Sequence, residues 1–169
     1  MALRLCCSVL LLCLCAPLLQ AQSLQEVNKA HEQGYTAYQQ GQYQEALVAY
    51  ERSLTLARQV KFPKSMAANL SSIGFLYGRL GRYDKALAHL EEALHIVRDL
   101  HLSHDIAATL HSLGAVYFFS SQYDKALAHF EEALQVPQGL TQPRARAAAL
   151  NSLGIAYSAL GDSDGALER

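Results

Sequence analysis

The sequence YDKALAHLEEAL at Tyr83–Leu94 returns as YDKALAHFEEAL at Tyr123–Leu134, with one change, Leu90 to Phe130. Weaker copies lie one period to either side: YQEALVAYERSL at Tyr43–Leu54 and SDGALER at Ser163–Arg169. A fixed period of this size indicates an array of supersecondary units, each of which buries its apolar face on the next.

Small residues keep the same period. The alanines are Ala46, Ala86, Ala126 and Ala166, and each follows a glycine at one constant interval: Gly34, Gly74, Gly114 and Gly154. A short break lies between glycine and alanine in every copy, at Gly41, Gly81, Ser121 and Gly161. Motifs such as LHSLGAVY (Leu110–Tyr117) therefore belong to one helix and the YDKALAH-type motifs to the next.

Apolar spacing and the breaks predict the helix bounds. The expected helices are Ser23–Gln39, Gln42–Val60, Lys64–Leu80, Arg82–Leu100, one with Ser103 as its N-cap, and Gln122–Val136. Thr141 and Pro143 predict the cap and first turn of a further helix. Gly161 is expected to end that helix, and a short one follows from Ser163.

This pattern resembles the tetratricopeptide repeat family over everything from about residue 24 onward. The family has small residues where the two helices of a hairpin cross, large apolar residues beside them, and a tyrosine one turn after the first glycine. In the third copy these positions are Gly114, Ala126, Ala133, Leu110, Leu113 and Tyr117. The 40-residue period, longer than the usual 34 or so, resembles the long-repeat members.

The resemblance implies an all-α, right-handed α-solenoid of helix-turn-helix hairpins. We expect one repeat domain over residues 22–169, with repeats at about 27–66, 67–106 and 107–146 and an incomplete one at 147–169. Solenoid ends need a polar cap, and the last repeat has only the beginning of its second helix. We therefore expect either an N-terminal fragment of a longer chain or a fourth repeat that frays and depends on a partner.

The segment Met1–Ala21 does not follow the repeat pattern. Arg4 precedes the apolar run Leu5–Leu14, and Pro17 and Ala21 follow, which is the pattern of a secretory signal peptide cleaved after Ala21. The apolar run is shorter than the roughly 20 residues that span a bilayer, so we expect no membrane insertion after cleavage. The protein is predicted to be exported, to a periplasm or out of the cell.

The cysteines and the charge narrow the possible functions. All four cysteines (Cys6, Cys7, Cys13 and Cys15) lie in the signal, so the mature chain has no disulfide, cysteine zinc site or catalytic thiol. Without Arg4 it carries 13 basic residues (14 − 1) against 15 acidic ones, a net charge of −2. This balance argues against nucleic-acid binding.

Motifs for catalysis, metals or cofactors are missing. The sequence has no phosphate-binding glycine loop, no G-x-S-x-G and no H-E-x-x-H. The nearest metal-like patterns are His89-x-x-Glu92 and its copy His129-x-x-Glu132, which we interpret as a solvated polar face, and His101-x-x-His104 with Asp105, interpreted as surface residues. We predict no enzyme activity, no catalytic or metal site and no cofactor.

The family resemblance implies a concave groove, lined by the first helix of each repeat, that takes a peptide or protein segment. The residues in this phase are His31, Tyr35, Tyr38, Ser71, Phe75, Arg79, His111, Phe118, Phe119, Asn151 and Ile155. Phe75 and Phe118 have an alternative role as core residues between repeats. The mixture predicts an apolar, partly aromatic channel.

The leading hypothesis is an exported, non-catalytic scaffold that binds a protein or peptide partner. The alternative, from the family resemblance, is the N-terminal arm of a longer enzyme or signalling protein, such as one with a caspase-like peptidase domain. A third hypothesis is a periplasmic assembly factor that self-associates through its uncapped last repeat.

Overall fold

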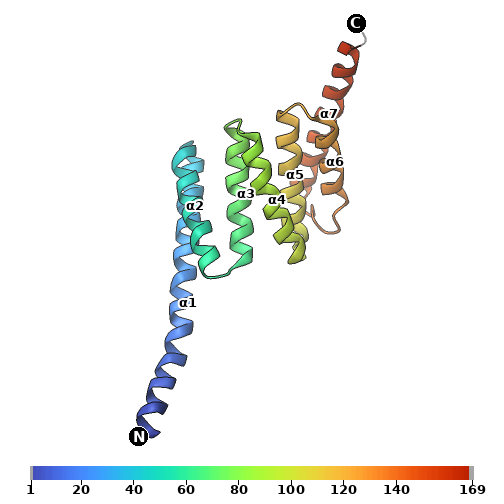
Figure 1. The fold of residues 1–169 in the computed structure, drawn as a ribbon. Coiled ribbons are helices and arrows are strands. Elements are labelled where there is room, and N and C mark those ends of the chain that lie inside the picture. The colour runs from blue at the N-terminus through green and yellow to red at the C-terminus, as the bar shows by residue number, and fades with distance from the viewer. Residues whose placement is uncertain (1, 168–169) are drawn as a thin grey trace. The chain divides into compact units, whose positions relative to one another are not determined.

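The computed structural model describes the backbone of residues 2–167 and the side chains of residues 21–161. Within these ranges it contains seven α-helices and no strand (Figure 1). The chain forms two compact units, Met1–Asn69 and Leu70–Arg169. The all-α solenoid of helical hairpins predicted from the repeat is confirmed.

The first unit is built on one hairpin. Its helices are α1 (Ala2–Gln39), α2 (Tyr43–Gln59) and the beginning of α3 (Pro63–Arg79). A Cβ atom at Gly34 would lie 2.8 Å from Cδ1 of the Tyr50 ring, so only glycine allows this approach of α1 to α2. The buried Ser53 hydroxyl donates a hydrogen bond to the Val27 carbonyl oxygen, 2.8 Å away, which satisfies a polar group inside the interface.

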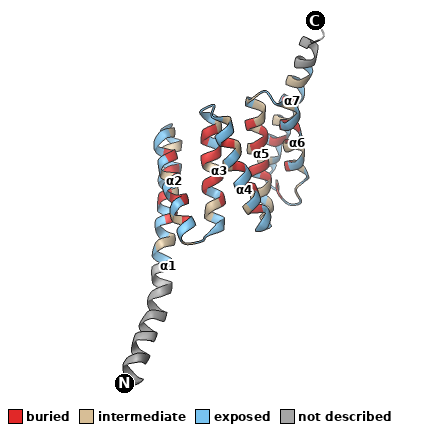
Figure 2. Cartoon of the chain, viewed as in Figure 1, coloured by how far each residue is buried: buried red, intermediate tan, exposed pale blue. Residues whose placement is uncertain are grey.

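The second unit contains the rest of α3, α4 (Tyr83–Asp99), α5 (Ser103–Phe119), α6 (Tyr123–Gln135) and α7 (Pro143–Leu167). Helix α5 packs against both α4 and α6, and α6 packs against α7. Buried residues lie along the sides where these helices meet (Figure 2). Phe130 is the largest fully buried side chain, in a cluster with Ala126, Leu127 and Ala156.

The crossing glycines recur in this unit. A Cβ atom at Gly74 would lie 2.7 Å from Cγ of Leu90, and one at Gly114 would lie 2.6 Å from the Phe130 ring. Each of these glycines therefore packs against the large side chain at one fixed position on the following helix, as Gly34 packs against Tyr50. The periodic small and large residues of the sequence are thus the two sides of one repeated contact.

The turn inside each hairpin closes in the same way. The backbone NH of Gln42, Arg82 and Gln122 donates to the carbonyl of Ala37, Tyr77 and Tyr117, respectively, at 2.9 Å in each case. This closure requires a left-handed residue, supplied by Gly41 (φ 76°), Gly81 (φ 70°) and Ser121 (φ 60°). Glycine adopts this conformation freely, whereas Ser121 adopts it at a cost.

Three of the predicted helix bounds are wrong. Helix α1 begins at Ala2, well before Ser23, and its backbone continues through Pro17. Leu102, not Ser103, is the N-cap of α5 and makes no side-chain cap bond. The preceding turn is instead closed by the Leu102 NH, which donates to the Val97 carbonyl.

The third error concerns the fourth hairpin. Helix α7 begins at Pro143 as predicted but continues through Gly161 to Leu167, so no separate helix begins at Ser163. Gly161 keeps a helical backbone, and a Cβ atom there would meet nothing within 4 Å. Adding a residue to an existing helix gains a hydrogen bond, whereas a new helix needs a nucleus and a face to bury.

The predicted signal peptide lies, apart from Ala21, outside the residues whose side chains are described, as do the side chains of Ser163–Arg169. No helix in the described part of the chain is long and apolar enough to cross a membrane.

Candidate functional site

All eleven residues predicted to line the groove keep solvent-accessible side chains. Tyr35, Phe75, Arg79, Phe119, Asn151 and Ile155 are exposed, and His31, Tyr38, Ser71, His111 and Phe118 are half-buried. Each lies on a first helix of a repeat: α1, α3, α5 or α7. The exposed faces of these helices, taken within each unit by itself, are called the first-helix face below.

One repeat position on this face carries large apolar side chains. It is occupied by Tyr35 in the first unit and by Phe75 and Ile155 in the second, which are 52%, 40% and 51% exposed. Ala115 holds the same position in α5 and is half-buried. The repeat thus has an apolar residue at this position, and the large side chains there stay exposed within their own unit.

An aromatic cluster forms where α5 ends and α6 begins. The Phe118 ring meets Phe119 edge-on at 5.7 Å between centroids and lies 5.5 Å from the Tyr123 ring. Phe119 is 60% exposed, while Phe118 also packs on the core cluster around Phe130. Phe118 therefore packs against the core and is also part of the exposed aromatic cluster.

Three of the predicted groove residues join neighbouring first helices. His31 Nδ1 lies 3.0 Å from Asn69 Oδ1 in the first unit. In the second unit Ser71 Oγ lies 3.4 Å from Thr109 Oγ1, and His111 Nε2 lies 3.1 Å from Ser152 Oγ. The equivalent residues His31, Ser71 and His111 thus each join one first helix to the first helix of the next repeat.

The acceptor of each bond is fixed on its own helix. Asn69 Nδ2, Thr109 Oγ1 and Ser152 Oγ each donate to the backbone carbonyl four residues earlier, at 2.8, 2.7 and 3.0 Å. Each of these side-chain oxygens then acts as the acceptor of the hydrogen bond between the helices. His31 therefore donates from Nδ1 and His111 from Nε2.

The two histidines at this position also touch the core. The His31 ring lies 5.1 Å from Tyr50, and the His111 ring lies 5.3 Å from Phe130, both tilted. Burial lowers the pKa of His111 below 6.5. The second repeat has the smaller pair Ser71 and Leu90, so the histidine and the aromatic ring occur together.

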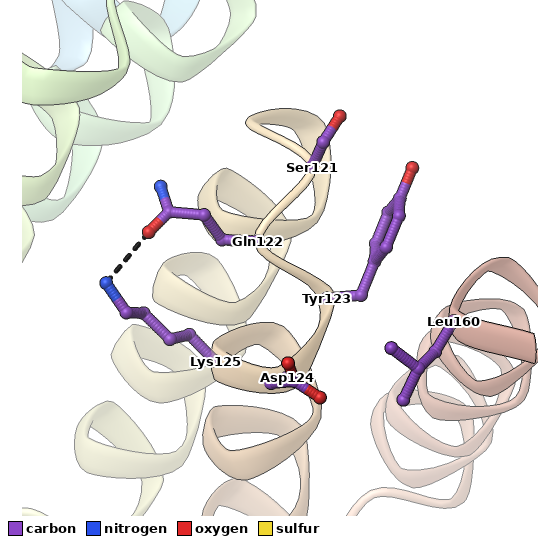
Figure 3. Close-up of a pocket in the computed structure, with 6 residues that line it drawn as sticks. All are labelled: Ser121, Gln122, Tyr123, Asp124, Lys125 and Leu160. Atoms are coloured by element: carbon purple, nitrogen blue, oxygen red, sulfur yellow. Dashed lines mark hydrogen bonds between the residues drawn. The ribbon is translucent and has the colours of Figure 1, made fainter. Parts of the chain in front are cut away.

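Clefts adjoin these helices in both units. A cleft of about 340 Å³ in the first unit is lined by Asn28, His31, Phe62, Lys64, Ser65, Ala68 and Asn69. In the second unit a cleft of about 520 Å³ lies between the start of α6 and Leu160 of α7 (Figure 3). Its other lining residues are Ser121, Gln122, Tyr123, Asp124 and Lys125, and Lys125 Nζ donates to Gln122 Oε1 at 2.8 Å.

Arg79 and Asn151, the polar residues predicted for the groove, lie on α3 and α7. They belong to the second and the fourth repeat, and the third repeat lies between them in the sequence.

The second helices carry a repeated stack that the sequence analysis missed. The Tyr77 and His89 rings are parallel, 5.6 Å apart, and the Tyr117 and His129 rings repeat the contact at 5.3 Å. Lys85 and Lys125 place their Nζ atoms 5.5 and 5.3 Å from the centroids of Tyr77 and Tyr117. The interpretation of His89 and His129 as a solvated polar face is therefore wrong.

A sequence signal for this stack existed. Tyrosine, lysine and histidine occur together in the second and third repeats, whereas the first repeat has Ala37, Glu45 and Ala49 at the three positions. In the fourth repeat Tyr157 occurs with Gly165 and Arg169 at the other two positions. The lysine and the histidine thus occur together, and only in repeats that also have the tyrosine.

The surroundings of His129 are charged. Burial lowers the pKa of His129, Glu132 and Glu91 oppose this change, and Arg98 adds to it. Arg98 forms an ion pair with Glu132. His129 Nδ1 is buried without a hydrogen-bond partner, which is compatible with a neutral ring.

No three His, Cys, Asp or Glu side chains cluster in a metal-binding arrangement in the described residues. His104, from the second metal-like pattern, donates from Nδ1 to the Gly139 carbonyl oxygen at 3.1 Å. This bond ties the start of α5 to the loop before α7.

Known structures share this fold. BtubC from P. vanneervenii is 20% identical, with a TM-score of 0.73 over 80% of this chain, which spans 57% of that protein's chain. The TPR domain of Arabidopsis FLU is 19% identical, with a TM-score of 0.63 over 66% of this chain and 94% of its own. For a Podosopora anserina putative kinesin light chain repeat protein the identity is 23%, the TM-score 0.66 and the coverage 84% and 70%.

No curated protein is similar enough to this chain to count as a relative. The family model described as "Tetratricopeptide repeat" matches three overlapping stretches, residues 25–99, 65–139 and 105–169. Together they cover every hairpin described above, and a scaffold for protein–protein interaction is what this fold implies. The chain belongs to the tetratricopeptide repeat family.

Proposed function

We propose that this chain is an exported, non-catalytic scaffold that binds a peptide or protein segment along its first-helix face. The observation that carries the proposal is the apolar repeat position of Tyr35, Phe75 and Ile155, about half exposed in each case. Phe75 and Ile155 belong to the same unit as the exposed aromatic cluster of Phe118, Phe119 and Tyr123, and contiguous exposed apolar surface marks interaction sites.

The fixed framework around these residues supports the proposal. Hydrogen bonds from His31, Ser71 and His111 hold neighbouring first helices within each unit. Side chains displayed on helices so joined are ordered before a partner arrives, which lowers the entropic cost of binding. The aromatic cluster of Phe118, Phe119 and Tyr123 adds anchors of the type that dominate binding energy.

Peptides selected from a random display library on the folded chain provide a test. We expect Phe75→Ala and Ile155→Ala each to weaken the selected peptides by about tenfold or more, because each removes a large apolar contact. Val48→Ala is the matched control, since Val48 is 60% exposed on the second helix α2. Equal losses in all three variants would overturn the placement of the groove.

The alternative of an N-terminal arm predicts a different result. The intact mass of the protein from its native source would then exceed that of residues 22–169 by a whole further domain. Self-association, the remaining prediction from the sequence, predicts a sedimentation coefficient that rises with concentration. A monomer at all concentrations would remove that prediction and leave the scaffold proposal unaffected.

A further inference from the structure

The tripeptide Asn69-Leu70-Ser71 in α3 has the form of an N-glycosylation acceptor, which is an asparagine followed two positions later by serine or threonine with no proline between. The other two asparagines of the sequence, Asn28 and Asn151, have alanine and leucine two positions later. Asn69 is therefore the asparagine that an exported chain would offer for this modification.

The folded chain encloses this asparagine. Asn69 is 0% exposed, and its Nδ2 atom donates to the Ser65 carbonyl oxygen at 2.8 Å. The Asn69 Oδ1 atom accepts a hydrogen bond from His31 Nδ1 of α1, 3.0 Å away. Both polar ends of the amide are thus engaged inside the first unit.

The space around Asn69 leaves no room for a glycan. N-glycosylation replaces one of the two hydrogens on Nδ2 with an oligosaccharide, so the bond to Ser65 could persist only if the sugar found space beside it. Asn69 borders the cleft that His31, Phe62 and Lys64 also line, yet Asn69 is not exposed to solvent through it. Because a glycan is bulky and solvated, its attachment excludes the contact of Asn69 with α1.

The transfer reaction itself requires access to the amide. The donor is an oligosaccharide linked to a lipid through pyrophosphate. The bond between Nδ2 and the sugar C1 forms, the bond from C1 to the pyrophosphate oxygen breaks, and Nδ2 loses one proton to a base of the transferase. The lipid pyrophosphate leaves, and nothing is oxidised or reduced. A transferase can reach Nδ2 in the unfolded chain, but not where Asn69 is buried in the folded helix α3.

We infer that Asn69 is a glycosylation acceptor only while the chain is unfolded, so that folding of the first unit and attachment of a glycan exclude each other. The inference rests on the proposed export, through a compartment that carries out N-glycosylation. A glycan on Asn69 would mark a chain that folded late and would prevent the native hydrogen bond between α1 and α3.

The order of the groups along the chain favours folding over modification. His31 and Ser65, which bond to the Asn69 amide, both precede it in the sequence. A chain that emerges with its N-terminus first therefore has these partners in place when Asn69 appears. Helical proteins with local contacts fold in microseconds to milliseconds, whereas synthesis adds only ~5–20 residues per second. The native chain is accordingly expected to leave the compartment without a glycan.

The test expresses the whole chain in cultured mammalian cells, with residues 1–21 as they are and, in parallel, with an unrelated cleaved signal peptide in their place. N-glycosidase digestion converts each modified asparagine to aspartate, and mass spectrometry then measures the modified fraction at Asn69. The secreted parent chain should be unmodified there. Gly34→Leu overfills the contact with the Tyr50 ring and opens the first unit, so it should raise the modified fraction by about tenfold or more.

Two further variants serve as controls. His101→Asn creates the same tripeptide, Asn-Leu-Ser, in the exposed turn between α4 and α5. His101 has a left-handed backbone, at φ 53°, which asparagine tolerates well. This variant should be modified at position 101 in the secreted, folded protein. Ser71→Ala added to Gly34→Leu should abolish the modification at Asn69, because it removes the acceptor tripeptide.

Two results would overturn the inference. One is a glycan on Asn69 of a secreted parent chain that resists protease as well as the unmodified chain does, since the folded state would then accommodate the sugar. The other is an unmodified Asn69 in Gly34→Leu when His101→Asn is modified, since the unfolded chain would then be no acceptor. Secretion with the unrelated signal but not with residues 1–21 would contradict the proposed export alone, because the unrelated signal still tests whether folding and glycosylation exclude each other.

Discussion

At the scale of single residues, the crossing glycines set the distance between the two helices of a hairpin. Gly34, Gly74 and Gly114 each face a large side chain so closely that a methyl group would collide with it. Gly154 has the same place in the repeat and no such neighbour. Glycine at this repeat position is therefore needed for helix packing in the first three repeats, whereas the fourth has room for a larger residue.

This contrast gives a prediction. Gly114→Ala should lower the free energy of unfolding by about 1–3 kcal/mol, because the new methyl group overpacks the Phe130 contact. Gly154→Ala should raise it by about 0.5–1 kcal/mol, since alanine is the better helix former and meets nothing. Urea unfolding of both variants measures the difference, and changes of the same sign would contradict the hairpin geometry.

Ser121 is a second residue whose replacement should change the stability of the fold, because its left-handed backbone conformation is unfavourable for serine. It holds the left-handed turn position, at φ 60°, that Gly41 and Gly81 hold in the other repeats. Ser121→Gly should raise the free energy of unfolding by about 0.5–1 kcal/mol, because glycine adopts this conformation without the steric penalty. The reverse exchange, Gly81→Ser, should lower it by a similar amount, and a destabilised Ser121→Gly variant would show that the serine side chain has a structural role.

At the scale of elements, the packing of α6 against α5 includes a half-buried histidine, His129. His129 stacks on Tyr117 with Lys125 beside the same ring, and Glu132, Glu91 and Arg98 are the other charged groups facing it. Burial lowers the folded-state pKa of His129 below its ordinary 6.5. The folded chain therefore takes up this proton less readily than the unfolded chain does.

The sign of the pH effect follows. A lowered histidine pKa contributes stability that is fully present above about pH 6.5 and is lost as the pH falls toward the folded-state pKa. We expect the free energy of unfolding to fall between about pH 7.5 and pH 5.5, and to fall less in His129→Gln. His111, whose pKa burial also lowers, contributes in the same direction, so His111→Gln is a parallel measurement. An equal decline in parent and both variants would contradict this account.

Phe119 separates binding from stability on the first-helix face. It is 60% exposed and contacts Phe118 edge-on. Phe119→Ala should change the free energy of unfolding by less than about 0.5 kcal/mol, as expected of a surface position. It should nevertheless weaken a display-selected groove peptide by about tenfold, the effect of losing an aromatic anchor. A larger loss of stability than of binding would assign Phe119 to the core.

The periodic part of the sequence was sufficient to predict these elements. Helix α6 lies within one residue of its predicted bounds, because Ser121, Gln122 and Pro137 break the helical pattern on both sides. Gly161 resembles the other turn positions equally well but lies inside α7. A turn of this kind forms only where a second helix has a face to bury, and that condition is tertiary rather than local.

The site was predicted less completely than the fold. Repeat phase placed Phe75 and Ile155 on an accessible face, because phase determines which side of a helix a residue occupies. Phase alone could not show that His111 would donate to Ser152, because that bond depends on the spacing of α5 and α7. Nor could it show that Tyr157 would be exposed where Tyr77 is buried, because exposure depends on what covers α7.

At the scale of the whole molecule, export would leave a protein whose stability comes from packing alone. All four cysteines lie between Met1 and Ala21, so cleavage after Ala21 removes every thiol. We predict that the protein from its native source begins at Gln22 and shows no reaction with a thiol reagent after denaturation. N-terminal peptide mapping by mass spectrometry checks this, and an N-terminal peptide that retains Cys13 and Cys15 would contradict the signal assignment.

The central claim is that a partner binds along the first-helix face. The most direct test places a photo-crosslinking benzoyl-phenylalanine at Phe75 in the expressing cell, with Ala88, an exposed residue on the second helix α4, as the matched position. The account predicts a discrete crosslinked polypeptide from position 75 and none from position 88. Crosslinks from position 88 alone, or the same crosslinks from both positions, would contradict it.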